Sequence, residues 1–344
     1  MKRVAIVGFG FMGKAHCGAW KKCRGAKVTA VCDSNLAQLT AKVTGNIKGA
    51  ADNSTLPDSV RVFDDFNAML AAGSFDIVDI TLPTPLHPEM SIAALNAGYH
   101  VLCEKPMALD LKSCDRMLAA AEKAKRLLLV AHCVRFFPEY AYLRKLVQSG
   151  RYGKVVAADF TRFMSAPKWS PKGGSWVLDE SKSGGLYLDA HIHDADFILS
   201  LFGKPKSVFS RSRRSRFGYV DHLNTVYDYP EMAVSSSASF AASDSLLWDA
   251  SARVFFEKAS VYLAAAGKVK LTVYPQGGKP FSPKLSGVSG YEAQAAYFLK
   301  MIDGKTGGDK ILTAKDARDA VALAIAERDG AEKGFNSKKR VEKK

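Results

Sequence analysis

Asp189 and His193 are the first residues whose types and spacing suggest chemistry. They lie four residues apart in the segment "GGLYLDAHIHDADF" (184–197), so on a helix they would share one face. An acid on the same face as a histidine suits proton transfer, because histidine titrates near neutral pH. The alternative is a histidine packed in the core. His191 and His193 also form an H-x-H pair, but no third ligand follows at the usual local spacing, so we predict no metal site.

A second chemical pattern lies near the start of the chain. Gly8, Gly10 and Gly13 have the spacing G-x-G-x-x-G, between a short β-branched run and a helix-like segment. In that context Gly8 permits a tight turn, Gly10 lets a pyrophosphate approach the backbone, and Gly13 allows close helix packing. The helix N-terminus then offers N–H groups to the phosphates. We therefore predict a dinucleotide site over this motif, which includes Phe11 and Met12.

Asp33 ends the second predicted strand, 25 residues after Gly8. An acid in this region accepts hydrogen bonds from the adenosine ribose hydroxyls, whereas the extra phosphate of NADP would meet a like charge. The residues therefore favour NAD over NADP. The alternative is that Asp33 only caps a helix over residues 35–42.

Glu104 and Lys105 form a charged pair directly before Pro106, just after an apolar run that ends at Leu102. Lys-Pro pairs are common at turns, so these residues alone leave the role of the pair open.

The elements that position these residues change character along the chain. Short apolar runs alternate with helix-like segments up to residue 126, and "LLLVAH" (127–132) would close the sheet. Alternation of this kind predicts an α/β Rossmann domain with a doubly wound parallel sheet, assigned to residues 1–126.

The second half consists mainly of runs that alternate apolar and polar residues, separated by short connections. This pattern predicts an α+β domain with a large, mainly antiparallel open sheet, assigned to residues 127–334 and to substrate binding and oligomerisation. Thr313 and Asp316 form a capping box before a C-terminal helix. Residues 335–344 are expected to be a basic, flexible tail.

Composition excludes several classes of protein. The 344 residues carry a net charge of +15, but no recognised nucleic-acid-binding motif accompanies the basic run "RSRRSR" (211–216), so no nucleic-acid partner is predicted. No apolar stretch approaches the ~18 residues of a membrane span. The six cysteines contain no C-x-x-C pair, which favours reduced core thiols. We expect a cytoplasmic protein.

The ordered set of motifs resembles a known family. It comprises "GFGFMG", "ITLPTPLHPEM", "AALNAGYHVLCEKPMAL", "VAHCVRFFPEY", "SGRYGKV" and "GGLYLDAHIHDADFILSLFG". From residue 1 to about 333 the chain resembles the two-domain NAD(P)-dependent oxidoreductases of glucose-fructose oxidoreductase and inositol 2-dehydrogenase, the Gfo/Idh/MocA family.

The resemblance implies roles for individual residues. It places Lys105, with Glu104, beside nicotinamide and substrate, and it implies that Asp189 and His193 complete the catalytic site. Thr84 and His87 match the segment that borders the cofactor. Histidine titrates near neutrality, so we assign the general base to His193, with Lys105 polarising the substrate oxygen and Asp189 orienting the site. The competing assignment makes Lys105 the base.

Substrate contacts are less defined. Inositol dehydrogenases of this family tend to have two arginines where this chain has Val134 and Arg135, which argues against inositol itself. His191 stands where the family usually has a small residue, so it would reshape the pocket. Trp169 or Trp176 would offer an apolar face to a sugar ring, or would only pack the loop.

The expected function is that of an NAD-dependent oxidoreductase. It would transfer a hydride between nicotinamide and a secondary hydroxyl of a sugar, sugar derivative or cyclic polyol. Two alternatives stay open: a redox-neutral glycosidase that retains NAD, and a non-catalytic NAD-binding sensor or regulator. Related enzymes bury the open sheet face against another subunit, so we expect a homodimer or homotetramer.

Overall fold

The structure is a computed structural model that describes residues 1–43, 51–53, 56–166, 176–246, 248–308 and 310–333. Its described residues form two compact units. The first consists mainly of Met1–Lys145 together with Lys284–Val321, and the second mainly of Val177–Pro283 together with strand β7 and the end of helix α9.

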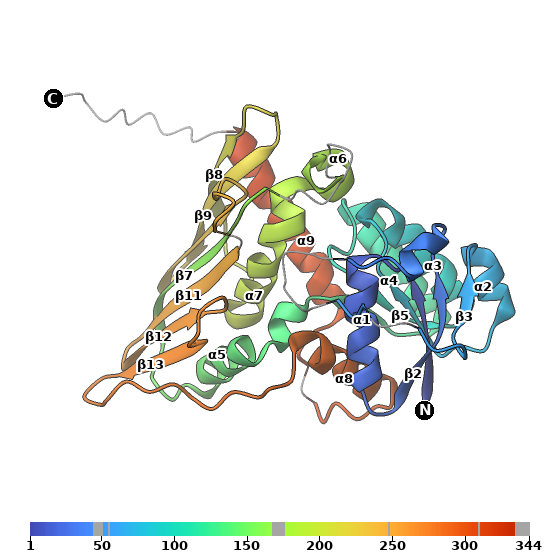
Figure 1. Cartoon of the computed structure of the whole chain (residues 1–344). Coiled ribbons are helices and arrows are strands. Elements are labelled where there is room, and N and C mark those ends of the chain that lie inside the picture. Colours follow the sequence, from blue (N-terminus) through green and yellow to red (C-terminus); the bar gives the residue numbers. More distant parts are fainter. Residues whose placement is uncertain (44–50, 54–55, 167–175, 247, 309, 334–344) are drawn as a thin grey trace. The chain divides into compact units, whose positions relative to one another are not determined.

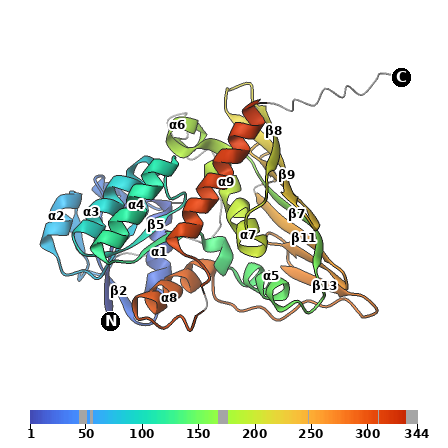
Figure 2. The same cartoon turned by 180° about the vertical axis from the view of Figure 1, so that it is seen from behind.

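The first unit contains a six-stranded parallel sheet with the order β3-β2-β1-β4-β5-β6. Its strands are β1 (Lys2–Val7), β2 (Ala26–Cys32), β3 (Arg61–Phe63), β4 (Ile77–Ile80), β5 (His100–Glu104) and β6 (Leu128–Ala131). The helices are α1 (Phe11–Lys22), α2 (Phe66–Ala72), α3 (His87–Asn96) and α4 (Leu111–Ala124). Figures 1 and 2 show α1 on one face of the sheet and α3 and α4 on the other. The predicted doubly wound parallel sheet is confirmed.

Helix α8 (Gly290–Ile302) brings a late part of the chain back to this unit. Its residues Tyr297 and Phe298 belong to the same apolar cluster as Trp20 of α1 and strand residues such as Ile6. Phe298 and Trp20 are fully buried. The core under α1 is therefore completed by residues nearly 280 positions later in the sequence.

The second unit contains a seven-stranded sheet with the order β13-β12-β11-β7-β10-β9-β8. Its strands are β7 (Val155–Met164), β8 (Val208–Arg214), β9 (Val220–Tyr229), β10 (Met232–Ser239), β11 (Trp248–Phe256), β12 (Ala259–Ala264) and β13 (Leu271–Pro275). Only the central pair β7 and β10 runs parallel, and the other neighbours are antiparallel. The large, mainly antiparallel sheet was therefore predicted correctly.

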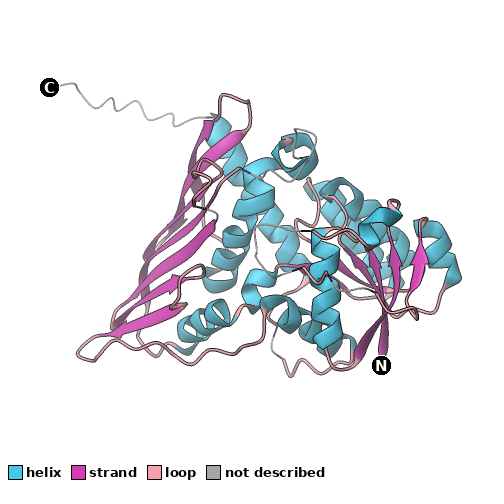
Figure 3. Cartoon of the chain, viewed as in Figure 1, coloured by secondary structure: helices cyan, strands magenta, loops and turns pink. Residues whose placement is uncertain are grey.

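The two faces of this sheet differ. Helix α7 (Ile192–Phe202) packs on β7, and Figure 3 shows the helix on one side of the strands. Burial alternates along β9, where Leu223, Thr225 and Tyr227 are buried but Asn224 and Val226 are exposed. The period of two expected for a strand with one covered face is present.

Helix α9 (Ala314–Lys333) begins at the predicted capping box. Asp316 Oδ2 accepts the backbone N–H of Thr313 at 2.7 Å, and Thr313 Oγ1 accepts that of Asp316 at 3.2 Å. The first turns of α9 belong to the first unit and its last turns to the second. The other helical elements of the described residues are η1 (Leu36–Leu39), η2 (Thr84–Leu86), η3 (Cys133–Phe136), α5 (Pro138–Ser149), η4 (Trp176–Leu178), α6 (Glu180–Ser183) and the π-helical η5 (Leu186–His191).

Within the part of the chain that the structure describes, no helix has both the length and the apolar character needed to cross a membrane.

Candidate functional site

The turn between β1 and α1 is built by its first and third glycines. Gly8 has a φ of +86°, in the region that favours glycine, and a Cβ there would come within 2.9 Å of the Thr81 carbonyl oxygen. A Cβ on Gly13 would clash with the carbonyl oxygen of Gly8. Thr81 Oγ1 donates to that same carbonyl at 2.6 Å. The turn is therefore tight and is held against the end of β4.

The space around Gly10 differs from that around Gly8 and Gly13. A Cβ added there would meet no atom within 4 Å, so the space over this backbone is open. Helix α1 starts at the next residue, Phe11, with no side-chain cap and no acid in its first turn. An open backbone at the N-terminus of a helix suits the two phosphates of a dinucleotide. Phe11 and Met12 are partly exposed at this end of the helix.

Asp33 lies at the end of β2, next to this turn. Its Oδ2 accepts the backbone N–H of Phe9 at 2.7 Å, and its Oδ1 accepts that of Asn35 at 2.8 Å. Asn35 is the N-cap of η1, so the alternative in which Asp33 caps that helix is wrong. The carboxylate is partly exposed, and each of its oxygens has a further lone pair for a ribose hydroxyl.

Lys105 follows the end of β5, at the same carboxyl edge of the sheet. Within residues 101–108 Lys105 alone is partly exposed, and Glu104 and the other residues of this run are buried. Ligands of open α/β sheets bind at this edge. The structure therefore brings the glycine turn, Asp33 and Lys105 to one edge of one sheet.

Thr84 and His87 lie in the segment that follows β4, and their exposed fractions are 3% and 0%. The two ring nitrogens of His87 lie 2.8 Å from the carbonyl oxygens of Pro106 and Leu82. Burial lowers the pKa of His87. The ring connects the loop after β4 to the segment that follows Lys105, so it acts on the site by holding backbone in place.

Asp189 and His193 belong to the second unit. Asp189 is in the π-helical turn η5 and His193 in the first turn of α7. Of residues 185–198, these two alone are partly exposed. Gly184 and Gly185 precede the turn, and both have a positive φ. A Cβ on Gly184 would come within 2.5 Å of Leu188. The segment therefore presents the predicted acid and histidine on its accessible side.

His191 lies between them in sequence but points into the core. It is 0% exposed, and its Nε2 lies 2.8 Å from Glu327 Oε2 of α9. Tyr227 of β9 donates to the other oxygen of Glu327 at 2.6 Å. Burial opposes the charged ring, but the carboxylate of Glu327 outweighs it and raises the pKa of His191. The residue supports the turn from inside.

Arg162 and Asp194 form a second buried pair in this unit. The guanidinium donates to both carboxylate oxygens, with Nε to Oδ2 at 2.7 Å and Nη2 to Oδ1 at 2.9 Å. Their side chains are 4% and 1% exposed. Because Asp194 directly follows His193, this pair connects the start of α7 to β7.

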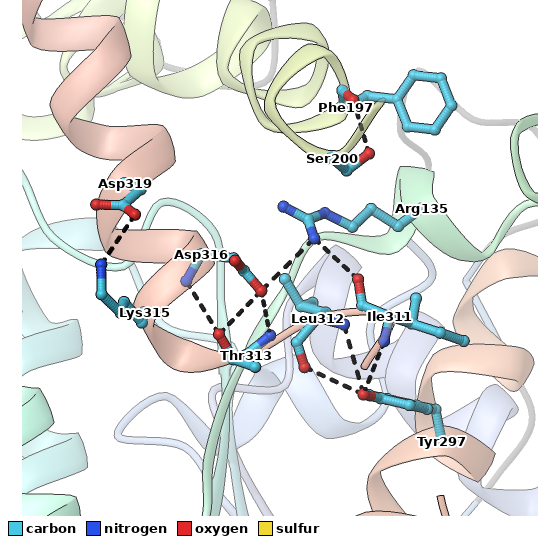
Figure 4. A network of polar contacts seen from close by, with 10 residues as sticks. All are labelled: Arg135, Phe197, Ser200, Tyr297, Ile311, Leu312, Thr313, Lys315, Asp316 and Asp319. Carbon is cyan, nitrogen blue, oxygen red and sulfur yellow. Dashed lines mark hydrogen bonds and ion pairs between the residues drawn. The ribbon is translucent and has the colours of Figure 1, made fainter. Parts of the chain in front are cut away.

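Arg135 is buried at 4% exposure in the first unit. Its Nη1 donates to the carbonyl oxygen of Ile311 at 2.8 Å and lies 3.7 Å from Asp316 at the start of α9, as Figure 4 shows. Its visible role is to hold the segment before α9. Trp169 lies outside the described residues, and Trp176 is 40% exposed.

Sequence reasoning missed a buried cluster beside Lys105. His16 of α1 lies between Asp79 of β4 and Glu104 of β5. One signal was available, because an aspartate inside the buried run 77–80 requires a polar partner. Within the described ranges, no group of three or more histidine, cysteine or acidic side chains is arranged to hold a metal ion.

Fold and site together define a nucleotide-binding protein of the Rossmann type. Residues 2–132 match the model described as "Oxidoreductase family, NAD-binding Rossmann fold", and residues 140–262 match the "GFO/IDH/MocA C-terminal domain". The chain belongs to this family of oxidoreductases, as its motifs predict.

Some of the curated relatives carry the names of sugar and polyol dehydrogenases. The chain is 33% identical over 217 residues to the D-glucoside 3-dehydrogenase of Escherichia coli, which is 61% of this chain and 57% of that protein. It is 32% identical over 159 residues to the inositol 2-dehydrogenase/D-chiro-inositol 3-dehydrogenase of Lactiplantibacillus plantarum, 46% of this chain and 43% of that protein. The chain thus spans about half the length of the curated relatives it matches.

Solved structures share the fold. The aldose-aldose oxidoreductase of Caulobacter crescentus has a TM-score of 0.82 and 22% identity, with 97% of this chain and 98% of that chain covered. A levoglucosan dehydrogenase in complex with NADH and levoglucosan has a TM-score of 0.79 and 19% identity, with 96% and 97% covered.

Proposed function

We propose that this protein is an NAD-dependent dehydrogenase acting on a secondary hydroxyl of a sugar, sugar derivative or cyclic polyol. The observation that carries the proposal is the carboxyl edge of the first sheet. There the open backbone at Gly10 follows β1 and the partly exposed Lys105 follows β5, two parallel strands with β4 between them. The names of the curated relatives support the substrate class.

The residues present fit the dinucleotide. Gly8, Gly10 and Gly13, with Phe11 and Met12, would hold its pyrophosphate at the N-terminus of α1, and Asp33 its adenosine ribose. Bound NAD supplies a hydride acceptor at its nicotinamide ring.

The remaining chemistry is proton transfer, which we assign to side chains of this chain. His193 accepts the proton of the substrate hydroxyl, because a base that titrates near neutral pH suits this step best. Lys105 donates a hydrogen bond to the substrate oxygen, and Asp189 balances its charge and orients the site. Asp189 and His193 are the accessible polar residues of their segment, as these roles require.

A substrate panel tests the function. Sugars, sugar acids, inositols and glycosides are incubated with the protein and NAD, and the absorbance of the reduced cofactor is followed. A dehydrogenase releases one NADH for each hydroxyl oxidised. Glycoside cleavage without net NADH would identify a redox-neutral glycosidase, and NAD binding without turnover on any compound would identify a sensor.

Cofactor choice is expected to favour NAD over NADP by about tenfold or more in kcat/KM, a difference of only ~1.4 kcal/mol. Asp33 is a carboxylate beside the predicted ribose position, and the following Ser34 and Asn35 bring no cation to balance a 2′-phosphate. Asp33→Ser should narrow the gap. Steady-state kinetics with both cofactors measure it.

Asp33→Asn is the matched control for charge, because its amide oxygen can still accept the Phe9 N–H that anchors the glycine turn. If the charge of Asp33 sets the preference for NAD, Asp33→Asn and Asp33→Ser should reduce the ratio of kcat/KM with NAD to kcat/KM with NADP by a similar factor. Equal kcat/KM with NADP in the unaltered protein would refute the assignment.

The exposed face of the second sheet is the surface that we assign to association with further copies. It carries exposed apolar side chains, among them Phe209, Val226, Tyr262 and Tyr274. A homodimer or homotetramer buries such side chains. Light scattering at micromolar concentration should give at least twice the monomer mass of 37.3 kDa, and a monomer there would contradict the assembly.

A further inference from the structure

His16, Asp79 and Glu104 form a buried polar cluster in the first unit. The Nδ1 of His16 donates to the Asp79 carboxylate at 3.0 Å, and its Nε2 donates to Glu104 Oε1 at 2.9 Å. The three side chains are 2%, 0% and 5% exposed. They come from α1, β4 and β5, so the cluster joins the helix after the glycine turn to two neighbouring strands.

The cluster contains a charged histidine. Both ring nitrogens face a carboxylate, and only a doubly protonated ring has two N–H donors. Burial opposes that charge, but Asp79 and then Glu104 outweigh it and raise the pKa of His16 to about 10. Burial also opposes the charge on Glu104, yet its bond to His16 lowers the pKa of the carboxyl. At neutral pH an imidazolium therefore lies between two carboxylates.

Glu104 connects this imidazolium to Lys105. Its second oxygen, Oε2, accepts the backbone N–H of Lys105 at 3.0 Å, and the charge of Lys105 also acts on the carboxylate. On the other side, the His87 ring contacts the carbonyl oxygen of Pro106. Contacts at both neighbouring residues, Glu104 and Pro106, thus fix the backbone around Lys105. Lys105 itself is partly exposed.

We propose that His16 is a positioning residue that keeps Glu104 ionised and oriented, and thereby sets the place of Lys105 in the candidate site. The inference rests on the proposed function, in which Lys105 contacts the substrate oxygen. Because His16 is buried, it contacts neither substrate nor cofactor itself, and it acts only through Glu104.

His16→Gln tests this, because glutamine can donate a hydrogen bond but carries no charge. The variant is expected to lower kcat at least about tenfold, since small displacements of a reacting group are costly, with a smaller change in the KM for NAD. Glu104→Gln should lower kcat similarly. If both act through one path, the double variant is no worse than the poorer single variant.

Hydrogen exchange gives a readout that needs neither turnover nor cofactor. The amide of Lys105 donates to Glu104, so His16→Gln should lose protection in a peptide over residues 100–108 but not in peptides over β2 and β6. A merely structural histidine would instead loosen the whole sheet when it is replaced.

Trp20→Phe is the matched control. Trp20 Nε1 donates to Asp79 Oδ2 at 2.6 Å and is equally buried, but it has no bond to Glu104. This variant should melt at a lower temperature and keep the kcat and the 100–108 protection of the unaltered protein.

The outcomes separate the two proposals. No NADH with any substrate in the unaltered protein refutes the proposed function, while the exchange pattern still decides the role of His16. Unchanged kcat or unchanged protection at Lys105 in His16→Gln refutes positioning. If that variant does not fold, the same two measurements on Glu104→Gln decide.

Discussion

Replacing His193 with alanine is expected to lower kcat for the true substrate by about 10² to 10⁴, the usual contribution of a general base. The ring is partly exposed in a segment whose neighbours are buried, as the proposed role of proton acceptor requires. Alanine removes the proposed proton acceptor and changes none of the residues that we propose to hold the dinucleotide. Steady-state kinetics should show the loss, and isothermal titration should show nearly unchanged NAD affinity.

His222→Ala is the matched control for this prediction. His222 is also a partly exposed histidine of the second unit, but it lies on β9 with its ring 6.2 Å from Phe163. Its loss should leave kcat unchanged. If His193→Ala keeps near wild-type kcat and the same pH profile, the histidine is only a packed helix residue. A changed pH profile in Lys105→Ala would then favour lysine as the base.

The strands of both sheets could be predicted from the sequence because each sheet imposes its own pattern. Parallel strands buried on both faces consist of short apolar runs, as in residues 4–7 of β1, whereas β9 alternates because one face is open. The return of α8 to the first unit was not predicted. Its packing against Trp20 depends on contacts between residues nearly 280 positions apart, which local periodicity does not report.

Parts of the candidate site were predictable for a similar reason. The glycine spacing describes a local turn, and Gly8 and Gly13 have the close contacts that this turn requires. Asp189 and His193 lie in helical elements, as expected, but Asp189 is in a π-helical turn and His193 in the α-helix that follows it. The local pattern contains no sign of the extra residue in that turn.

The buried partners were not predictable. His16 and Glu104 are 88 residues apart, and His191 and Glu327 are 136 apart, so only the folded chain brings each pair together. In sequence His191 resembled a residue that lines a pocket. The structure instead places its ring in the core against Glu327 and Tyr227.

Replacing Asp194 with asparagine is expected to destabilise the second unit by about 3–5 kcal/mol, because it breaks a buried ion pair by removing the carboxylate that Arg162 contacts through two nitrogens. The pair is bidentate and almost fully buried, so water cannot replace the lost carboxylate. The charge of Arg162 also acts on the neighbouring His191, which would become harder to protonate. Thermal melting should show a fall of roughly 10 °C for a unit of this size.

Two comparisons identify the cause of that loss. Glu231→Gln breaks an exposed ion pair of the same unit, Lys154–Glu231 at 2.8 Å, and should leave the melting temperature unchanged because solvent screens both charges. Arg162→Met combined with Asp194→Leu removes both buried charges and should recover much of the stability, since neither ion then has to be desolvated. A melting temperature for Asp194→Asn equal to that of Glu231→Gln would show that the buried pair contributes no more than a surface pair. Failure of the double variant to recover stability would instead assign the loss to packing around α7 rather than to the broken ion pair.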